Sequence, residues 1–218
     1  MKGGLFIAGT DTGVGKTWVA VRLLRLLRER GLDAVGMKPV ECGGREDATA
    51  LHEAAGKAIE LDEVNPYALA EPLAPAAVEQ APRIDFETVK ALHRGLSERH
   101  DFVIVEGAGG WLVPLDRERT MADLAASLGL PVLLVAANRL GVLNHVLLTV
   151  RAIAASGLEC DGVFLNTLDG EDDPSRASNA RVLREILPTI PVIDGDLEAL
   201  VLLPAVDRSK VGTTSRFP

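Results

Sequence analysis

Short apolar runs recur along the chain, and each is bounded by glycine, proline or a charged residue. Runs that are rich in Val, Leu and Ile and too short for a helix are typical of strands buried on both faces of a sheet. Such strands are predicted at residues 5–9, 34–38, 102–106, 132–137 and 162–166, with a short sixth strand at 191–193.

Between these runs, apolar residues recur at helical spacing. The segments concerned are 16–30, roughly 85–99, 121–128, 143–156 and 175–187. Alternation of strand and helix predicts an α/β fold, a doubly wound and mostly parallel sheet with right-handed crossovers. Ligands of such sheets bind at the carboxyl ends of the strands.

Two stretches interrupt this alternation. The first is predicted to be an irregular surface excursion, because it contains Pro66, Pro72, Pro75 and Pro82. The second, residues 169–174, is an acidic stretch typical of a solvated loop. Neither stretch marks a domain boundary, and the chain has no internal repeat. A length of 218 residues therefore predicts one domain spanning residues 1–218.

Composition narrows the class of protein. Hydrophobic residues make up 47% of the chain and aromatics only 4%, so the core must consist mainly of aliphatic side chains, as in helix-covered parallel sheets. A net charge of −8 would repel nucleic acid and an anionic membrane surface. No apolar stretch reaches the length of a membrane span, and no basic and apolar leader opens the chain. We therefore expect a soluble cytoplasmic protein without a nucleic-acid or membrane partner.

Two cysteines, Cys42 and Cys160, lie far apart and form no CxxC pair. This usage fits a reducing compartment and argues against a structural zinc or a disulfide framework. Cys160 begins an apolar run, so a small core residue is expected there.

The first predicted strand leads into Gly9-Thr-Asp-Thr-Gly-Val-Gly-Lys-Thr17, which then opens an amphipathic helix. Small residues let consecutive backbone N–H groups converge on phosphate oxygens at a helix N-terminus. Lys16 is then placed to reach the β- and γ-phosphates, and the Thr17 hydroxyl to ligate Mg2+. Five residues separate Gly9 from Gly15 where the simple pattern has four, so this is a variant P-loop. The alternative is a glycine-rich turn with an exposed lysine.

A Mg·ATP site needs one or two carboxylates besides a hydroxyl. Glu106 ends a predicted strand and precedes four small residues, 107–110, whose backbone is free to approach phosphate. Asp47 begins a helical pattern nine residues after Lys38. The alternatives are a solvated strand end for Glu106 and, for Asp47, a purely structural role at a helix N-terminus.

Lys38 closes the second predicted strand, so its side chain points into the same crevice as the P-loop. A second ammonium there would neutralise charge that builds up during phosphoryl transfer. The alternative is a surface lysine with a partly buried stem.

Together these residues resemble the dethiobiotin synthetase family. The matching blocks occur in the family's order from residue 5 to about 166, roughly three quarters of the chain. They are 9–17 as above, Lys38-Pro-Val, Asp47-Ala-Thr-Ala-Leu, Asn65-Pro-Tyr, Glu71-Pro-Leu-Ala-Pro, Val105-Glu-Gly-Ala-Gly-Gly-Trp and Leu140-Gly-Val-Leu-Asn-His.

The resemblance implies a reaction, the penultimate step of biotin synthesis. CO2 carboxylates 7,8-diaminononanoate to a carbamate, ATP phosphorylates the carbamate, and the second amine closes the cyclic urea with release of phosphate. No protein nucleophile is needed, so catalysis comes from positioning and electrostatics.

The resemblance also implies residue roles. The catalytic residues are Lys16, Lys38 and Thr12, which faces the diamine, and the Mg2+ ligands are Thr17, Asp47 and Glu106. The nucleotide-binding residues are Gly13, Val14, Gly15, Lys16, Thr17, Trp18, Asp47, Glu106, Gly107, Ala108, Gly109, Asn166, Thr167, Pro204, Ala205 and Val206. The substrate-binding residues are Thr12, Lys38, Cys42, Gly110, Gly141 and Asn144.

Two positions depart from the family's pattern. Gly13 stands where the best-known members have a glutamate, so a nucleotide contact from that side chain is lost. Cys42 stands where they have a serine, and a thiol is the poorer hydrogen-bond donor. A redox or nucleophilic role for Cys42 is the alternative.

Two further implications concern the ends of the site. Asn166, ending the fifth strand, pairs with the adenine edge, and Pro204, Ala205 and Val206 match the family's adenine loop. In the family the site lies at a homodimer interface, where the helix start near Gly141 and Asn144 receives the substrate carboxylate from the neighbouring subunit. A helix N-terminus is a suitable carboxylate site, although an ordinary first helical turn is the alternative.

Two other functions share parts of this pattern. Chromosome-partition and cell-division-positioning ATPases use a similar variant P-loop, but their early signature lysine is absent from residues 10–14. A cobyrinate-amidating synthase would need an added glutaminase domain, for which the chain has no room.

Overall fold

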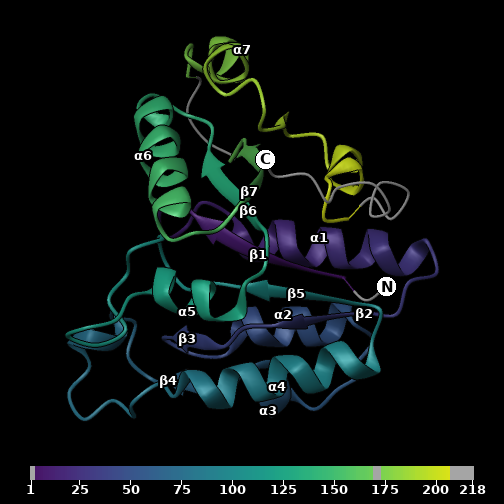
Figure 1. Ribbon diagram of the computed structural model, residues 1–218, viewed down its shortest axis with the longest axis vertical. Coiled ribbons are helices and arrows are strands. Elements are labelled where there is room, and N and C mark those ends of the chain that lie inside the picture. The colour runs from purple at the N-terminus through teal and green to yellow at the C-terminus, as the bar shows by residue number, and fades with distance from the viewer. Residues whose placement is uncertain (1–2, 169–172, 207–218) are drawn as a thin grey trace, which may run out of the picture.

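The computed structural model describes residues 3–168 and 173–206. Within these ranges the main sheet has six parallel strands, drawn in Figure 1. They are β1 (Gly3–Gly9), β2 (Ala34–Met37), β5 (Phe102–Glu106), β6 (Val132–Ala137), β7 (Cys160–Asn166) and β8 (Val192–Asp194). Their order across the sheet is β2-β5-β1-β6-β7-β8, which confirms the doubly wound α/β fold.

Helices connect the strands. They are α1 (Lys16–Glu29), α2 (Glu46–Ala54), α3 (Leu61–Val64), α4 (Phe86–Arg99), α5 (Met121–Leu128), α6 (Val142–Ala155) and α7 (Arg176–Ile186), with short 3-10 helices η1 (Pro75–Ala77) and η2 (Glu198–Leu202). Right-handed crossovers put α1 on one face of the sheet, since it leads towards β2, and α4 to α7 on the other. None of the helices in the described ranges combines the length and apolar composition that crossing a bilayer requires.

The core forms between the sheet and these helices. Phe6, Phe102 and Phe164 are its largest fully buried side chains, and each lies in an inner strand of the sheet with 1% exposure or less. Aliphatic residues supply nearly all the rest, as the composition predicted. Because the strands are buried on both faces, only their carboxyl ends and the loops beyond them are free to carry a site.

The predicted strands and helices are confirmed, with ends that differ by at most two residues. Lys38 lies just beyond β2 and does not end it. Cys160 is partly buried against the core, and burial raises the pKa of its thiol to about 12. Most of the acidic stretch, residues 169–172, lies outside the described residues.

The excursion predicted to be irregular contains regular structure. Its first part, β4 (Tyr67–Leu69), pairs in parallel with β3 (Val40–Cys42) to form a second, two-stranded sheet. Its proline-rich part contains η1. Strands of three residues leave too little periodicity to be recognised in a sequence.

Candidate active site

The P-loop connects the carboxyl end of β1 to the first turn of α1. Gly13 and Gly15 adopt positive φ angles of 76° and 90°, which other residues rarely adopt. A Cβ atom on Gly15 would also clash with Asn166 Nδ2, so the Asn166 side chain would have to move to admit one. The backbone at both positions therefore favours glycine, although a Cβ atom on Gly13 would meet no neighbouring atom.

The Lys16 side chain folds back along this loop and is almost fully buried. Its Nζ donates a hydrogen bond to the Asp11 carbonyl oxygen at 3.0 Å. Burial and, next, the positive charge of Lys38 lower the pKa of Lys16 to about 8. An ammonium held in this way interacts strongly with an incoming polyanion, because phosphate oxygens replace the solvation that burial removed.

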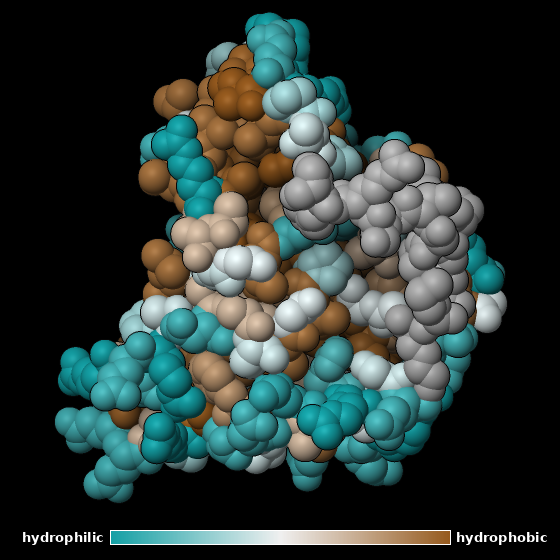
Figure 2. All heavy atoms as spheres, viewed as in Figure 1, coloured by the Kyte–Doolittle hydropathy of each residue, from teal (hydrophilic) through white to brown (hydrophobic). Residues whose placement is uncertain are grey.

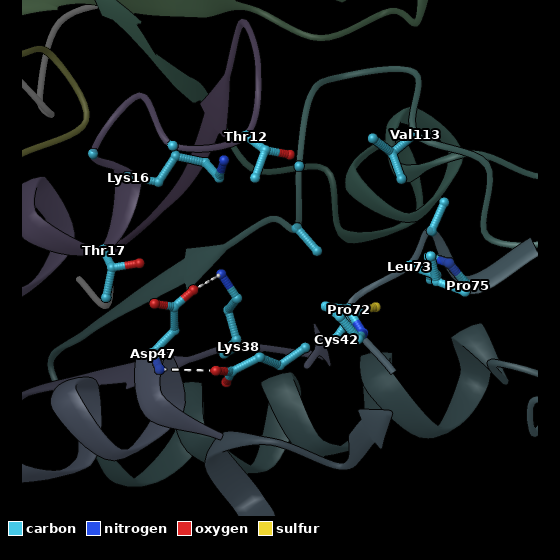
Figure 3. Close-up of a pocket in the computed structure, with 16 residues that line it drawn as sticks. Thr12, Lys16, Thr17, Lys38, Cys42, Asp47, Pro72, Leu73, Pro75 and Val113 are labelled. Carbon is cyan, nitrogen blue, oxygen red and sulfur yellow. Dashed lines mark hydrogen bonds and ion pairs between the residues drawn. The ribbon is translucent and has the colours of Figure 1, made fainter. Parts of the chain in front are cut away.

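Two carboxylates and the second lysine lie beside the loop. Glu106 is fully buried at the end of β5, and its Oε1 accepts hydrogen bonds from Thr17 Oγ1 at 2.8 Å and Lys38 Nζ at 2.5 Å. The same Nζ lies 2.8 Å from Asp47 Oδ2, as Figure 3 shows. The Lys38 ammonium therefore joins the two predicted carboxylate ligands.

The pKa values in this cluster follow from its charges. Burial alone would lower the pKa of Lys38, but Glu106 and Asp47 outweigh burial and raise it. Burial alone would raise the pKa of Asp47, but the Lys38 ammonium lowers it below its usual range. Both side chains are therefore charged at neutral pH.

The oxygen atoms of this cluster fit a magnesium ion. Glu106 Oε2 is buried and has no hydrogen-bond partner among the described residues. Thr17 and Asp47 contribute a hydroxyl and a second carboxylate, the hard oxygen donors that Mg2+ prefers. Residues 3–168 and 173–206 contain no cluster of three His, Cys, Asp or Glu able to hold a metal, so this site would also depend on Thr17 and bound phosphate.

These groups open into a pocket of about 500 Å3, shown in Figure 3. Lys16, Lys38 and Asp47 make one side of it polar and charged. The opposite side is apolar, because residues 72–75 and Val113 line it. The pocket can therefore take a molecule that is polar at one end and aliphatic along its length.

Most of the predicted phosphate, metal and substrate residues meet at this pocket: Thr12, Gly13, Gly15, Lys16, Thr17, Lys38, Cys42, Asp47, Ala108 and Gly109. Gly107 lies beside them, since its carbonyl oxygen accepts from Lys38 Nζ at 3.3 Å. Gly110 packs on the P-loop, where a Cβ atom would lie 3.3 Å from the Thr10 carbonyl oxygen.

Sequence reasoning assigned no role to several lining residues, namely Glu41, residues 72–75 and Val113. The Glu71-Pro-Leu-Ala-Pro block was the available signal for the apolar wall, because it resembles a family block. Glu41 offered no such signal.

The predicted adenine loop, Pro204 to Val206, does not join the site. Ala205 N donates to Asp161 Oδ2 at 3.1 Å, and Asp161 is the second residue of β7. That is the amino edge of the parallel sheet, whereas the P-loop lies at the carboxyl edge. The chain reaches the amino edge because η2 packs along α1, where Glu198 pairs with Arg30 at 2.8 Å.

Asn166 ends the fifth predicted strand, as expected, and its pairing with adenine stays a prediction. This residue ends β7 beside the P-loop, and its Nδ2 donates to the Val14 carbonyl oxygen at 3.0 Å. Thr167 follows it and is exposed. The end of β8 lies at the same edge, where Gly195 N donates to the Leu165 carbonyl oxygen at 3.1 Å.

Three other predicted residues lie on helix starts. Trp18 is 44% exposed in the first turn of α1, with the Arg22 guanidinium 5.7 Å from its ring centroid. Gly141 precedes α6 with a φ of 92°, and Asn144 is exposed one turn later. Neither Gly141 nor Asn144 lines the pocket.

Known sequences resemble this chain over most of its length. A family model described as an AAA domain matches residues 3–203. The ATP-dependent dethiobiotin synthetase of Anaeromyxobacter dehalogenans (strain 2CP-C) is 49% identical, with 87% of each chain covered. That of Akkermansia muciniphila is 44% identical, covering 82% of this chain and 85% of the relative. That of Aromatoleum aromaticum is 43% identical, covering 98% of this chain and 96% of the relative.

Solved structures with similar folds are more distant in sequence. The cell division protein FtsY of Thermotoga maritima is 17% identical with a TM-score of 0.56, and the match covers 91% of this chain and 64% of that one. The kinase domain of the Escherichia coli tyrosine kinase ETK has the same identity and TM-score, with 78% and 70% covered. These likenesses show the fold alone. The synthetases, by contrast, match in sequence over most of both chains, so this chain belongs to the ATP-dependent dethiobiotin synthetase family.

Proposed function

We propose that this chain makes dethiobiotin from 7,8-diaminononanoate, CO2 and ATP, with ADP and phosphate as the other products. One amine attacks CO2 and loses a proton to give a carbamate. A carbamate oxygen then takes the γ-phosphoryl group of ATP, and ADP leaves. The second amine attacks the carbonyl carbon, releases phosphate and a proton, and closes the urea ring.

One observation carries this proposal. In a chain of this family, Lys16, Lys38 and Asp47 line one pocket at the end of a P-loop, and the buried Glu106 pairs with Lys38 beside it. Every bond that forms joins two substrates, so the protein needs no nucleophile and acts by positioning and electrostatic stabilisation. The buried ammonium groups of Lys16 and Lys38 suit that task.

The phosphates are proposed to bind over the P-loop. Backbone N–H groups of residues 13–17 would donate to phosphate oxygens at the start of α1. Lys16 would exchange its bond to the Asp11 carbonyl for the β- and γ-phosphates. Lys38 would stabilise charge on the carbamate and the transferring phosphoryl group.

Thr17, Asp47 and Glu106 are proposed to hold Mg2+. A bound Mg2+ would neutralise negative charge on the β- and γ-phosphates. The unpartnered Glu106 Oε2 supports this assignment, since a buried carboxylate oxygen normally has a partner.

The purine is proposed to lie between Asn166, Thr167 and the end of β8 near Gly195. These residues share the carboxyl edge of the sheet with the P-loop. Residues 204–206 have no part in this proposal, because they lie at the opposite edge.

The diamine is proposed to lie in the pocket with its amines near Thr12, Cys42 and Gly110. Its aliphatic chain would run along the apolar wall of residues 72–75 and Val113. Burial of such a wall by methylene groups is favourable, at about 0.8 kcal/mol per buried CH2.

We further propose a homodimer in which the start of α6, with Gly141 and Asn144, receives the substrate carboxylate of the partner's site. Neither residue lines the pocket of its own chain, so a second chain would bring them there. Exposed apolar side chains here support a covered face: Leu140, just before α6, is 79% exposed, and Leu148, on α6, is 57% exposed. Figure 2 shows apolar atoms gathered over this part of the molecule.

We also propose that the chain works as one domain in the cytoplasm. A single hydrophobic core contains residues from Leu5 to Val206, which supports one domain. Cys42 and Cys160 are both free thiols, as a reducing compartment favours.

An assay of ADP release tests the proposed function. The purified protein is supplied with ATP, Mg2+, diaminononanoate and bicarbonate, and each is omitted in turn. We expect turnover only with the complete set. ADP release at an equal rate without the diamine would contradict the proposal, because it would indicate a simple ATPase.

A further inference from the structure

The helix that carries Asp47 lacks a capping side chain at its own start. Its N-cap residue is Arg45, which makes no side-chain cap hydrogen bond. The Arg45 guanidinium instead donates to Asn65 Oδ1 at 3.1 Å and to the Leu61 carbonyl oxygen at 3.0 Å. The first N–H groups of any helix have no partner within the helix, so α2 needs an acceptor from elsewhere.

Glu41, in β3, supplies that acceptor. Its Oε1 accepts from Asp47 N at 2.8 Å and its Oε2 from Ala48 N at 2.9 Å. These are the second and third N–H groups of α2, which N-cap side chains usually satisfy. Glu41 is only 5% exposed, and two charge-assisted hydrogen bonds at a helix N-terminus offset the cost of burying its carboxylate.

The segment 38–41 therefore holds Asp47 at two points. Lys38 Nζ bonds the Asp47 carboxylate at 2.8 Å, and Glu41 bonds the Asp47 backbone. Lys38 is shared, because it also bonds Glu106. Under the proposed function Lys38 additionally serves the phosphates, whereas both Glu41 oxygens bond only the start of α2 in this arrangement.

We propose that Glu41 is a positioning residue that sets the Asp47 carboxylate for metal binding. This inference rests on the proposed function, in which Asp47 ligates Mg2+. Glu41 keeps the start of α2 in place when Lys38 turns towards the phosphates, so the Asp47 carboxylate stays beside Thr17 and Glu106. Groups that orient a metal ligand in this way typically change metal affinity by about 10- to 100-fold when removed.

The test is the affinity of the ADP-saturated protein for Mn2+, measured by electron paramagnetic resonance. Glu41→Ala should weaken Mn2+ binding about 10- to 100-fold. Glu41→Gln keeps one carbonyl oxygen as an acceptor and should give an intermediate affinity. In turnover, Glu41→Ala should need more Mg2+ for its half-maximal rate, while kcat at saturating Mg2+ stays closer to wild type.

Asp85→Ala is the matched control. The Asp85 side chain caps α4 through Glu87 N and Thr88 N, both at 3.2 Å, and lies outside the pocket. This variant loses a carboxylate cap of the same kind, and its Mn2+ affinity should equal that of wild type. Asp47→Asn is the reference for the ligand itself and should weaken Mn2+ binding.

The outcomes separate this inference from the proposed function. If Asp47→Asn weakens Mn2+ binding and both Glu41 variants bind like Asp85→Ala, Glu41 has no positioning role. If Asp47→Asn binds like wild type, the metal assignment fails, and this inference with it.

Hydrogen exchange at the amides of Asp47 and Ala48 should be faster in Glu41→Ala. Weaker Mn2+ binding with unchanged exchange would mean that Glu41 is itself a ligand, and would overturn the proposal. Glu41→Gln decides the matter if Glu41→Ala does not fold.

Discussion

Lys38 Nζ lies 2.5 Å from Glu106 Oε1, and both side chains are buried, with 3% and 0% exposure. Lys38 follows β2 and Glu106 ends β5, and these strands are neighbours in the sheet. The ion pair therefore connects two adjacent strand ends directly beneath the pocket. It satisfies one oxygen of the buried Glu106 carboxylate, Oε1, and places an ammonium where the phosphates are proposed to bind.

Removal of Lys38 should therefore affect stability as well as turnover. Lys38→Ala leaves Glu106 buried without its main partner and should lower the free energy of unfolding by about 3–5 kcal/mol. Lys38→Met combined with Glu106→Gln removes both charges and should recover part of that loss. Urea unfolding measures each variant. Arg181→Ala, which breaks an exposed pair with Glu185, should cost under about 1 kcal/mol. Equal losses for Lys38→Ala and Arg181→Ala would contradict this account of the pair.

Nucleotide binding should take up protons near pH 8. Burial lowers the pKa of Lys16 to about 8 in the ligand-free protein, so about half of the molecules carry a neutral amine at that pH. Phosphates favour the ammonium, so ATP binding raises this pKa. The affinity of the protein for ATP should therefore be greatest below pH 8 and should fall as the pH rises above 8. Calorimetry at pH 8.5 in two buffers of different ionisation enthalpy measures the uptake. Lys16→Arg stays charged and should show no proton uptake. Identical binding heats for wild type in both buffers would contradict the lowered pKa of Lys16.

Cys42→Ser should keep or raise turnover. Cys42 lines the pocket, and burial raises the pKa of its thiol, which disfavours the reactive thiolate. A hydroxyl donates the stronger hydrogen bond to substrate. Steady-state kinetics compare kcat and KM with those of Cys160→Ser, a thiol replacement outside the pocket. Complete loss of turnover in Cys42→Ser alone would indicate chemistry that requires sulfur.

Mixed dimers should test the shared site. Lys16→Ala removes the P-loop charge of one chain, and Asn144→Glu places a repelling carboxylate at the helix start of the other. After random exchange about half of the dimers are mixed, and each has one site with both residues intact, giving roughly a quarter of wild-type activity. Lys16→Ala mixed with Lys38→Ala should stay at background, since every site then has a defect. Background activity in both mixtures, with exchange demonstrated, would place the whole site in one chain.

Much of this site could be predicted because its residues stand next to strong local signals. The P-loop follows a clear buried strand, and Glu106 ends another, so their meeting at one edge follows from parallel topology. Lys38 and Asp47 were identified in the same way, from a strand end and a helix start. Their mutual hydrogen bond, however, is a tertiary contact that no spacing reveals.

The residues that were missed depend on such contacts. Glu41 accepts hydrogen bonds from two backbone N–H groups. Nearly every residue has such a group, so the sequence does not indicate which ones Glu41 contacts. Residues 72–75 of the apolar wall belong to a proline-rich excursion whose sequence has no helical or strand periodicity to predict their position. Residues 204–206 were misplaced because the course of η2 back along α1 to the amino edge is set by packing and not by a local pattern.

The most direct test of the central claim is the fate of labelled carbon. The protein is incubated with 13C-bicarbonate, ATP, Mg2+ and diaminononanoate, and the product is analysed by mass spectrometry alongside the ADP formed. We expect dethiobiotin with one 13C in its ureido carbonyl and one ADP for each molecule made. The absence of labelled dethiobiotin while ADP accumulates in the presence of the diamine would contradict the proposed reaction.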